Sequence, residues 1–219
     1  MKGQALGRRM LRPDAVDKVT GRAHFPGDLH LEGALQAKVL FSERTHARIL
    51  SIDVSEAEQV SGVVAILTHE DVPVNEYGLM HKDQPALNGE RVRSVFDRVA
   101  LVIAETARAA RRAVGLIRIE YEDLPALTDP REAMKPGAPA VQADWPDNIQ
   151  SHQRIRKGDV EAAFERDDVV IVESDYFTPH QEHAYLQPEA GVGYIDEQGR
   201  VTVHSAGQWS HDDQHQIAH

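Results

Sequence analysis

Apolar runs and alternating segments follow one another along the first 125 residues, which predicts strands separated by short helices. Residues 99–104 are a continuous apolar run of strand length, and residues 106–115 are rich in Ala and Arg, both good helix formers. In residues 117–122 apolar and charged side chains alternate, as they do in a half-buried strand. This order predicts a compact βαβ-type unit whose short helix connects two strands.

A second unit of the same kind precedes it in the chain. Three further segments have strand-like patterns: residues 35–41, 49–54 and 63–67. Between the last two, Ser55 and Glu58 have the spacing of a capping box, so we expect Ser55 to cap a helix that begins at Glu56 and is ended by Gly62. The two units could share one mixed sheet. The polar segment 68–89 is longer than a normal loop, and ordered loops of this length are often functional or form interfaces.

Six prolines and glycines in residues 125–146 predict a domain boundary. We therefore assign an N-terminal arm and first domain to residues 1–135, a linker to residues 136–153, and a second domain to residues 154–219. The second domain is expected to contain a helix at 159–166, a strand at 169–177, a hairpin of residues 191–195 and 201–204, and the start of a helix at Ser210.

Composition excludes several classes of protein. The net charge of −11, with scattered basic residues, argues against binding to nucleic acid. The sequence contains no cysteine, so these residues form no disulfide and hold no cysteine-ligated iron–sulfur centre. No run approaches the 18 apolar residues of a membrane span, and the first residues lack the apolar region of a signal peptide. We therefore expect a cytoplasmic protein.

Histidines near the C-terminus are the first candidates for chemistry. His211, His215 and His219 are four residues apart and share one face of a helix, a spacing that can bind zinc. The sequence lacks the His-Glu-x-x-His pattern, so it favours adventitious metal binding and predicts no native metal site. His180 and His183 flank Glu182, and this group could perform acid–base work or form a polar approach to a strand with satisfied hydrogen bonds. The residues alone favour the second interpretation, and no catalytic residue is assigned in this chain.

The order and spacing of many short motifs carry more information than any one of them. The motifs include Lys18-Val19-Thr20-Gly21, His46-Ala47, Asp71-Val72-Pro73, Ile119-Glu120-Tyr121-Glu122 and Gly158-Asp159. Together they resemble the N-terminal part of the molybdenum-binding subunit of the xanthine dehydrogenase and aldehyde oxidase family. The resemblance spans nearly the whole chain.

The resemblance implies an α+β fold: an α/β hammerhead domain with a mixed sheet, followed by an incomplete first molybdopterin-binding domain. Enzymes of this family hydroxylate an N-heterocycle or an aldehyde with oxygen from water. The implied cofactor is molybdenum–molybdopterin, shared with a remaining molybdopterin-binding segment, while iron–sulfur clusters and FAD are expected on partner subunits. A small molecule is the expected substrate.

Gln208 is the one cofactor-binding residue that the resemblance implies, because it aligns with a glutamine that lies near the molybdenum. From the residues alone, Gln208 would instead satisfy backbone groups at the end of the strand before it. The sequence departs from the family at three positions: Phe96 stands where glycine is usual, Arg98 where proline is usual, and Gln187 where glutamate is usual.

The glycine-rich segment that cradles the pterin and the catalytic glutamate are both expected beyond residue 219. We therefore expect a fragment, a truncated reading frame or one piece of a split subunit, inactive alone. The alternative is a non-catalytic assembly module that docks the iron–sulfur and flavin subunits.

Overall fold

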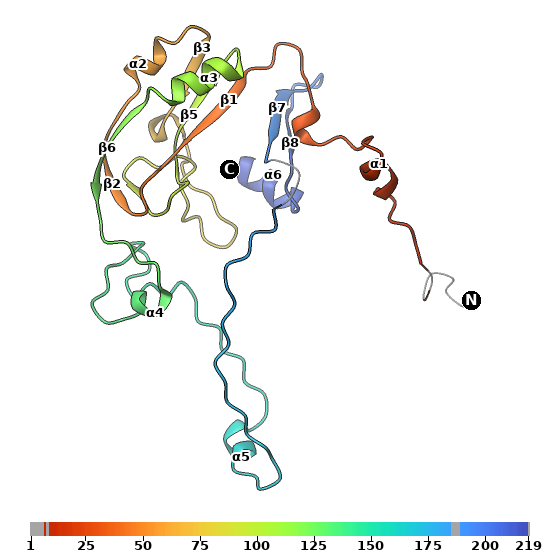
Figure 1. Ribbon diagram of the computed structural model, residues 1–219, viewed down its shortest axis with the longest axis vertical. Coiled ribbons are helices and arrows are strands. Elements are labelled where there is room, and N and C mark those ends of the chain that lie inside the picture. The colour runs from red at the N-terminus through yellow and green to blue at the C-terminus, as the bar shows by residue number, and fades with distance from the viewer. Residues whose placement is uncertain (1–6, 8, 185–188, 219) are drawn as a thin grey trace.

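A computed structural model describes residue 7 and residues 9–184 and 189–218, and its first 125 residues contain two three-stranded sheets (Figure 1). The first sheet has the order β1–β5–β3 and is built from β1 (Gln36–Phe41), β3 (Val63–Leu67) and β5 (Arg98–Ala104). The second has the order β4–β2–β6 and is built from β2 (Ala47–Asp53), β4 (Arg91–Val92) and β6 (Arg118–Asp123). The predicted α+β class and its strands are confirmed, with ends shifted by one or two residues.

The pairing of these strands differs from the prediction. Helix α3 (Ala107–Val114) connects β5 to β6, and α2 (Ser55–Glu58) connects β2 to β3, so each helix leads from one sheet to the other. All strand pairs in the described part of the chain are antiparallel. The expected single mixed sheet was therefore wrong, because periodicity shows which face of a strand is buried but not which strand lies beside it.

The core lies where α3 covers the first sheet. Ala109, Ala110 and Ala113 are buried on one face of the helix and pack with Val102 and Ala104 of β5. The small alanine side chains let the helix approach the sheet closely. Thr106 caps α3, because its hydroxyl accepts a hydrogen bond of 3.2 Å from the Ala109 N–H.

The predicted capping box at α2 is wrong. Val54 is the N-cap residue, and Ser55 is already the first residue of the helix. The carboxylate of Asp53 accepts the Ser55 N–H at 2.9 Å. An aspartate two residues earlier thus takes the role that the pattern had given to the serine.

Residues 68–89, here called the long loop, are held by specific hydrogen bonds. A 3-10 turn, η2 (His69–Asp71), begins it, and Thr68 caps this turn. The Asn75 amide donates to the Leu87 carbonyl at 2.7 Å and accepts from the Leu87 N–H at 2.9 Å. Tyr77 and Gln84 exchange two backbone hydrogen bonds, of 2.7 and 3.1 Å.

The proline-rich segment after β6 is anchored to this loop. It contains α4 (Pro130–Ala133), and the side chain of Asn148 accepts the Val141 N–H at 2.8 Å. The ring of Trp145 meets that of His81, in the long loop, edge to face with centroids 4.9 Å apart. The boundary at residues 136–153 stays a prediction.

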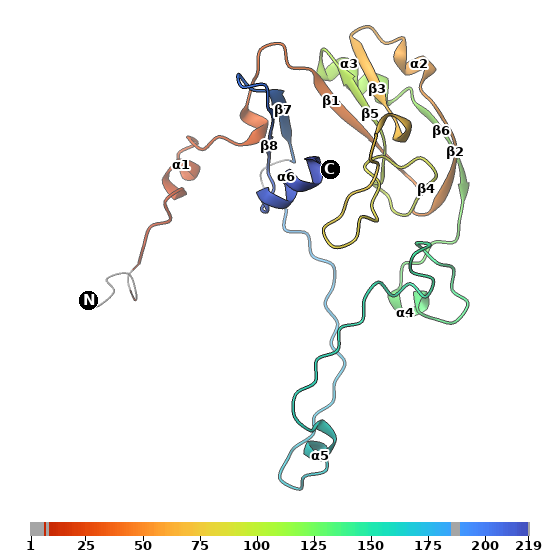
Figure 2. The ribbon, with the colours of Figure 1, turned by 180° about the vertical axis from the view of Figure 1, so that it is seen from behind.

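Residues 150–184 run away from both sheets, with α5 (Val160–Phe164) at the far end (Figures 1 and 2). The predicted helix at 159–166 is confirmed in its central part. The predicted strand at 169–177 was wrong, because these residues are extended without strand pairing. A strand needs the backbone groups of a neighbour, and no described segment supplies them; Val170 is 90% and Phe177 is 87% exposed.

The last described part is the predicted hairpin and helix: β7 (Gly191–Ile195), β8 (Val201–Ser205) and α6 (Ser210–Ala218). The N-terminal arm, which holds α1 (Ala15–Val19), reaches this hairpin through η1 (Pro26–Asp28), which packs beside β7. A Cβ atom on Gly27 would lie 3.6 Å from the Cβ of Ala190. Within the described ranges, no helix has the length and apolar character needed to cross a membrane.

Asp196 fixes the turn of this hairpin. Its carboxylate accepts the N–H groups of Gln198 and Arg200, both at 2.9 Å, and pairs with the Arg200 guanidinium. These contacts, the backbone N–H of Arg200 above all, lower the pKa of Asp196 below its ordinary value of 3.8. Gly199 supplies the positive φ of 77° that the turn requires.

Candidate functional site

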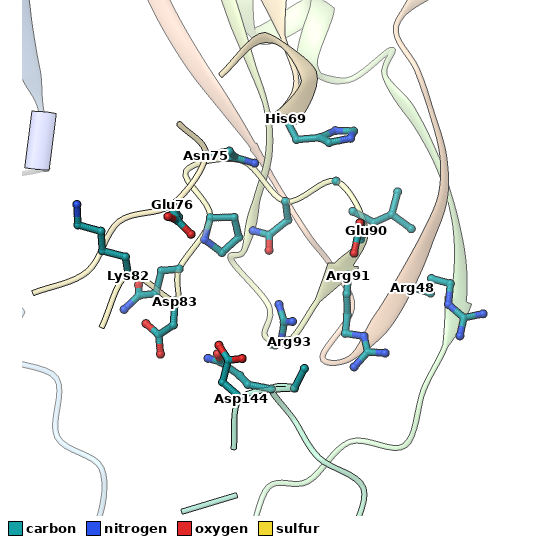
Figure 3. Close-up of a pocket in the computed structure, with 17 residues that line it drawn as sticks. Arg48, His69, Asn75, Glu76, Lys82, Asp83, Glu90, Arg91, Arg93 and Asp144 are labelled. Atoms are coloured by element: carbon teal, nitrogen blue, oxygen red, sulfur yellow. The ribbon is translucent and has the colours of Figure 1, made fainter. Parts of the chain in front are cut away.

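One cavity, of about 760 Å³, lies between the long loop, β4 and residues 142–144 (Figure 3). Charged side chains of both signs surround it: Arg48, Lys82, Arg91 and Arg93 with Glu76, Asp83, Glu90 and Asp144. Two of the arginines have other partners, because Arg48 pairs with Glu122 at 2.5 Å and Arg93 donates to the Val141 carbonyl at 2.9 Å. The balanced charge selects no class of ligand, so this cavity is not the strongest candidate.

A second cavity, of about 550 Å³, lies where the long loop meets the hairpin and α6. Tyr77 is its lining residue from the long loop, and the others come from residues 189–191, 205–207 and α6. Asp213, in the first turn of α6, is one of them. Its Oδ2 atom is buried and has no hydrogen-bond partner among the described residues. An unpaired buried carboxylate oxygen is costly, and it can accept a hydrogen bond from a ligand.

Gly207 makes this arrangement possible. A Cβ atom at residue 207 would lie 1.8 Å from Asp213 Oδ2, so a larger residue would displace the carboxylate. The turn from β8 into α6 therefore needs glycine where the Asp213 side chain folds back against it.

Gln208 follows directly after Gly207, in the turn between β8 and α6. Its side chain is exposed and makes no hydrogen bond to any described residue. The interpretation that Gln208 satisfies backbone groups at the end of β8 is therefore not supported by a contact. Gln208 itself does not line the second cavity, although its chain neighbour Gly207 does.

The histidine candidates do not form a site in the described residues. His211 and His215 lie on α6, while His219 lies outside the described residues. The Glu182 carboxylate accepts the Ala184 N–H at 3.1 Å, next to His183. Within the described part of the chain, no group of three or more His, Cys, Asp or Glu residues is placed to hold a metal ion. Gln187 lies outside the described residues.

Sequence reasoning missed two features of the second cavity. Tyr77 and Asp213 are 136 positions apart, and no local pattern indicates that they line the same space. The long loop was noted for its length alone. One signal for Tyr77 was present in the sequence: residue 98 is arginine where the family resemblance predicts proline, and Arg98 contacts Tyr77.

Comparisons with known proteins match both parts of the chain. Residues 20–125 match the family model described as aldehyde oxidase and xanthine dehydrogenase, a/b hammerhead domain. Residues 141–219 match that of the molybdopterin cofactor-binding domain.

Similar proteins extend well beyond the length of this chain. A probable xanthine dehydrogenase subunit of Bacillus subtilis is 39% identical over 95% of this chain and 28% of its own length. The nicotinate dehydrogenase large molybdopterin subunit of Eubacterium barkeri is 37% identical over 98% of this chain and 50% of its own length. A crystal structure of the aldehyde oxidoreductase from Desulfovibrio desulfuricans superposes with a TM-score of 0.78, at 34% identity, over 89% of this chain and 23% of that one. The chain thus spans half or less of the length of these relatives.

Proposed function

Because the chain belongs to the aldehyde oxidase and xanthine dehydrogenase family, as its N-terminal part, we propose that it forms the first portion of a molybdenum hydroxylase. Its substrate would be an N-heterocycle or an aldehyde, hydroxylated with oxygen from water. The chain would work with the remaining molybdopterin-binding segment, an iron–sulfur subunit and an FAD subunit. A cytoplasmic setting is part of this proposal.

The observation that carries the proposal is the exposed amide of Gln208, which directly follows Gly207, a lining residue of the second cavity. Gln208 projects from the β8–α6 turn without a described hydrogen-bond partner. The adjacent wall holds the unpaired Oδ2 atom of Asp213. A neutral amide donor and a buried acceptor together suit an uncharged or hydrogen-bond-donating part of a ligand better than a phosphate.

These residues fit one part of a molybdenum–molybdopterin cofactor. Gln208 would donate a hydrogen bond toward the metal side without adding charge, and Asp213 would accept one from an N–H group. When bound, the cofactor would supply the redox chemistry of the reaction. The residues of this chain would orient it and shield it from water. Turnover would require the remaining segment, which would supply a glycine-rich cradle and a glutamate base.

The second candidate function is an assembly module that docks partner subunits. It is favoured by residues 150–184, which run away from both sheets (Figure 2). Several of their apolar side chains are exposed. Ile155 is 94% exposed, and Tyr176 is 89% exposed. Exposed apolar surface of this extent is typical of residues that pack against another polypeptide.

Co-expression distinguishes the two functions. Residues 1–219 are produced alone and together with the segment of a relative that carries the glycine-rich cradle, and bound molybdenum is measured by mass spectrometry. We expect molybdenum only in the combined sample. Stoichiometric molybdenum with turnover by residues 1–219 alone would overturn the need for the remaining segment. Capture of iron–sulfur and flavin subunits, without molybdenum in either sample, would favour the assembly module.

A further inference from the structure

We propose that Arg98 is a positioning residue, which holds Tyr77 in place as a wall of the second cavity. The inference concerns a residue at which this sequence departs from its family. Its relevance to the cofactor rests on the proposed function, in which Gln208, next in the chain to the lining residue Gly207, faces the cofactor.

Arg98 contacts Tyr77 in two ways. The Nη2 atom of Arg98 donates a hydrogen bond to the Tyr77 hydroxyl, and the guanidinium carbon lies 5.1 Å from the centroid of the Tyr77 ring. The same Nη2 atom lies 3.4 Å from the carbonyl oxygen of Pro85, on the returning side of the long loop. One guanidinium therefore contacts both sides of the loop, which a planar group with several donors can do.

The Tyr77 hydroxyl extends this connection. It donates a hydrogen bond of 3.0 Å to Oε1 of Gln84, the residue whose backbone pairs with that of Tyr77. Side-chain and backbone contacts thus join the same two residues. The Tyr77 hydroxyl oxygen accepts a hydrogen bond from Arg98, so its own hydrogen is available to donate to Gln84.

Arg98 is itself fixed by the core. It is the first residue of β5, and the next two residues, Val99 and Ala100, are fully buried. Asn88 holds the Arg98 carbonyl from two sides, through its backbone N–H at 2.7 Å and its side-chain amide at 3.0 Å. The guanidinium therefore anchors the long loop to the central strand of the first sheet.

The other side of Tyr77 faces the hairpin. Tyr77 lines the second cavity together with Gly207, Asp213 and residues of β7. Without the contact to Arg98, the loop would still close through its backbone pair, but its tip could move away from the hairpin. Arg98 would then influence the cavity through Tyr77, although it does not line it.

The family resemblance predicts proline at this position, and proline has no side-chain donor. A chain with proline here would lack this restraint on Tyr77.

Amide hydrogen exchange on the 219-residue chain tests the inference without any cofactor. We compare Arg98→Met, which keeps the aliphatic length, with Tyr77→Phe, the double variant, and Arg98→Lys. Arg108→Met serves as the control, because Arg108 is an exposed arginine of α3 with no contact to the loop. Protection of residues 99–104 reports whether each variant is folded.

We expect Arg98→Met to speed exchange at the Tyr77 and Gln84 amides by about 10- to 100-fold, as for loss of a charged hydrogen bond. Exchange in β7 should also rise, since Tyr77 no longer closes the cavity. Tyr77→Phe should have a similar effect, the double variant should add little to it, and Arg98→Lys should recover part of the protection. Arg108→Met should change neither region.

Unchanged exchange in β7, with faster exchange in the loop, would overturn the inference by showing that Arg98 only stabilises the loop. Additive effects of the two single variants would also overturn it. Should Arg98→Met unfold the chain, Tyr77→Phe decides alone, because it removes a single hydroxyl. A failure here leaves the role of Gln208 unaffected, since no molybdenum takes part in the measurement.

Discussion

The ring of Phe96 meets that of Phe41 edge to face, with centroids 6.1 Å apart and an angle of 80° between the planes. Phe96 makes this contact from a backbone φ of 75°, the left-handed region that bulky residues rarely adopt. This geometry explains why the family resemblance predicts glycine at residue 96. The chain tolerates the strained phenylalanine, which is 74% exposed.

Replacing Phe96 should therefore separate strain from packing. Relief of the left-handed strain is worth about 1–3 kcal/mol, and a half-exposed aromatic pair contributes at the low end of about 0.5–1.5 kcal/mol. Glycine also loses more conformational entropy on folding than phenylalanine, which offsets part of this gain. Phe96→Gly should therefore raise the free energy of unfolding by about 0.5–1 kcal/mol. Phe96→Ala keeps the strain and loses the ring, so it should lower that free energy by about 0.5 kcal/mol. Urea denaturation measures both, and a glycine variant less stable than the alanine variant would contradict this account.

Gly78 is a position in the long loop where backbone atoms leave no room for a side chain. Its φ is 152°, and an added Cβ atom would lie 1.8 Å from the carbonyl oxygen of His81. Gly78→Ala should lower the free energy of unfolding by about 1–3 kcal/mol and speed amide exchange at Tyr77 and Gln84. The clash is with backbone, so a side-chain rotation cannot relieve it.

Gly137 provides the matched control for this substitution. It also has a positive φ, of 82°, but a Cβ atom there would meet nothing within 4 Å. Gly137→Ala should therefore cost only the backbone term, about 1 kcal/mol, and leave the loop amides unchanged. Equal effects of the two substitutions on exchange at Tyr77 would show that the His81 contact is unimportant.

Acid should loosen the hairpin through Asp196. The folded state lowers the pKa of this carboxyl, so its contribution to stability is complete above the ordinary value of 3.8. The contribution is lost as pH falls below that value and the carboxyl gains a proton. Nuclear magnetic resonance should then show the Gln198 and Arg200 amide signals moving toward unfolded positions below pH 3.8.

The variant Asp196→Asn tests this explanation, because an amide oxygen still accepts the two N–H groups but does not titrate. Its Gln198 and Arg200 signals should change little over the same range of pH. A titration of equal size in the variant would assign the effect to another group.

The sequence was sufficient for elements whose identity depends on local pattern. Residues 106–115 predicted α3 because alanine and arginine are good helix formers whatever lies around them. The hairpin was predictable because its turn residues, Asp196 and Gly199, act locally. Long-range pairing was not predictable in the same way, and the division of β5 and β6 between two sheets shows this.

The candidate site was only partly accessible from the sequence. The resemblance predicts Gln208 as a site residue. Alternation alone predicted a strand at residues 169–177, although the described chain offers them no partner. The cavity itself depends on Tyr77 and Asp213, far apart in the sequence, lining the same space. Such contacts leave no periodic signal, so the structure was needed to find them.

The most direct test of the central claim is the molybdenum content of the reconstituted subunit with Gln208→Ala. Gln59→Ala is the control, because Gln59 is an exposed glutamine of the first domain with no described side-chain hydrogen bond. If Gln208 faces the cofactor, its loss should lower cofactor retention or turnover by about 10- to 100-fold, while the first domain stays folded and the control is unchanged. Molybdenum content and rate equal to those of the unaltered subunit would contradict the claim and leave Gln208 without a role at the cofactor.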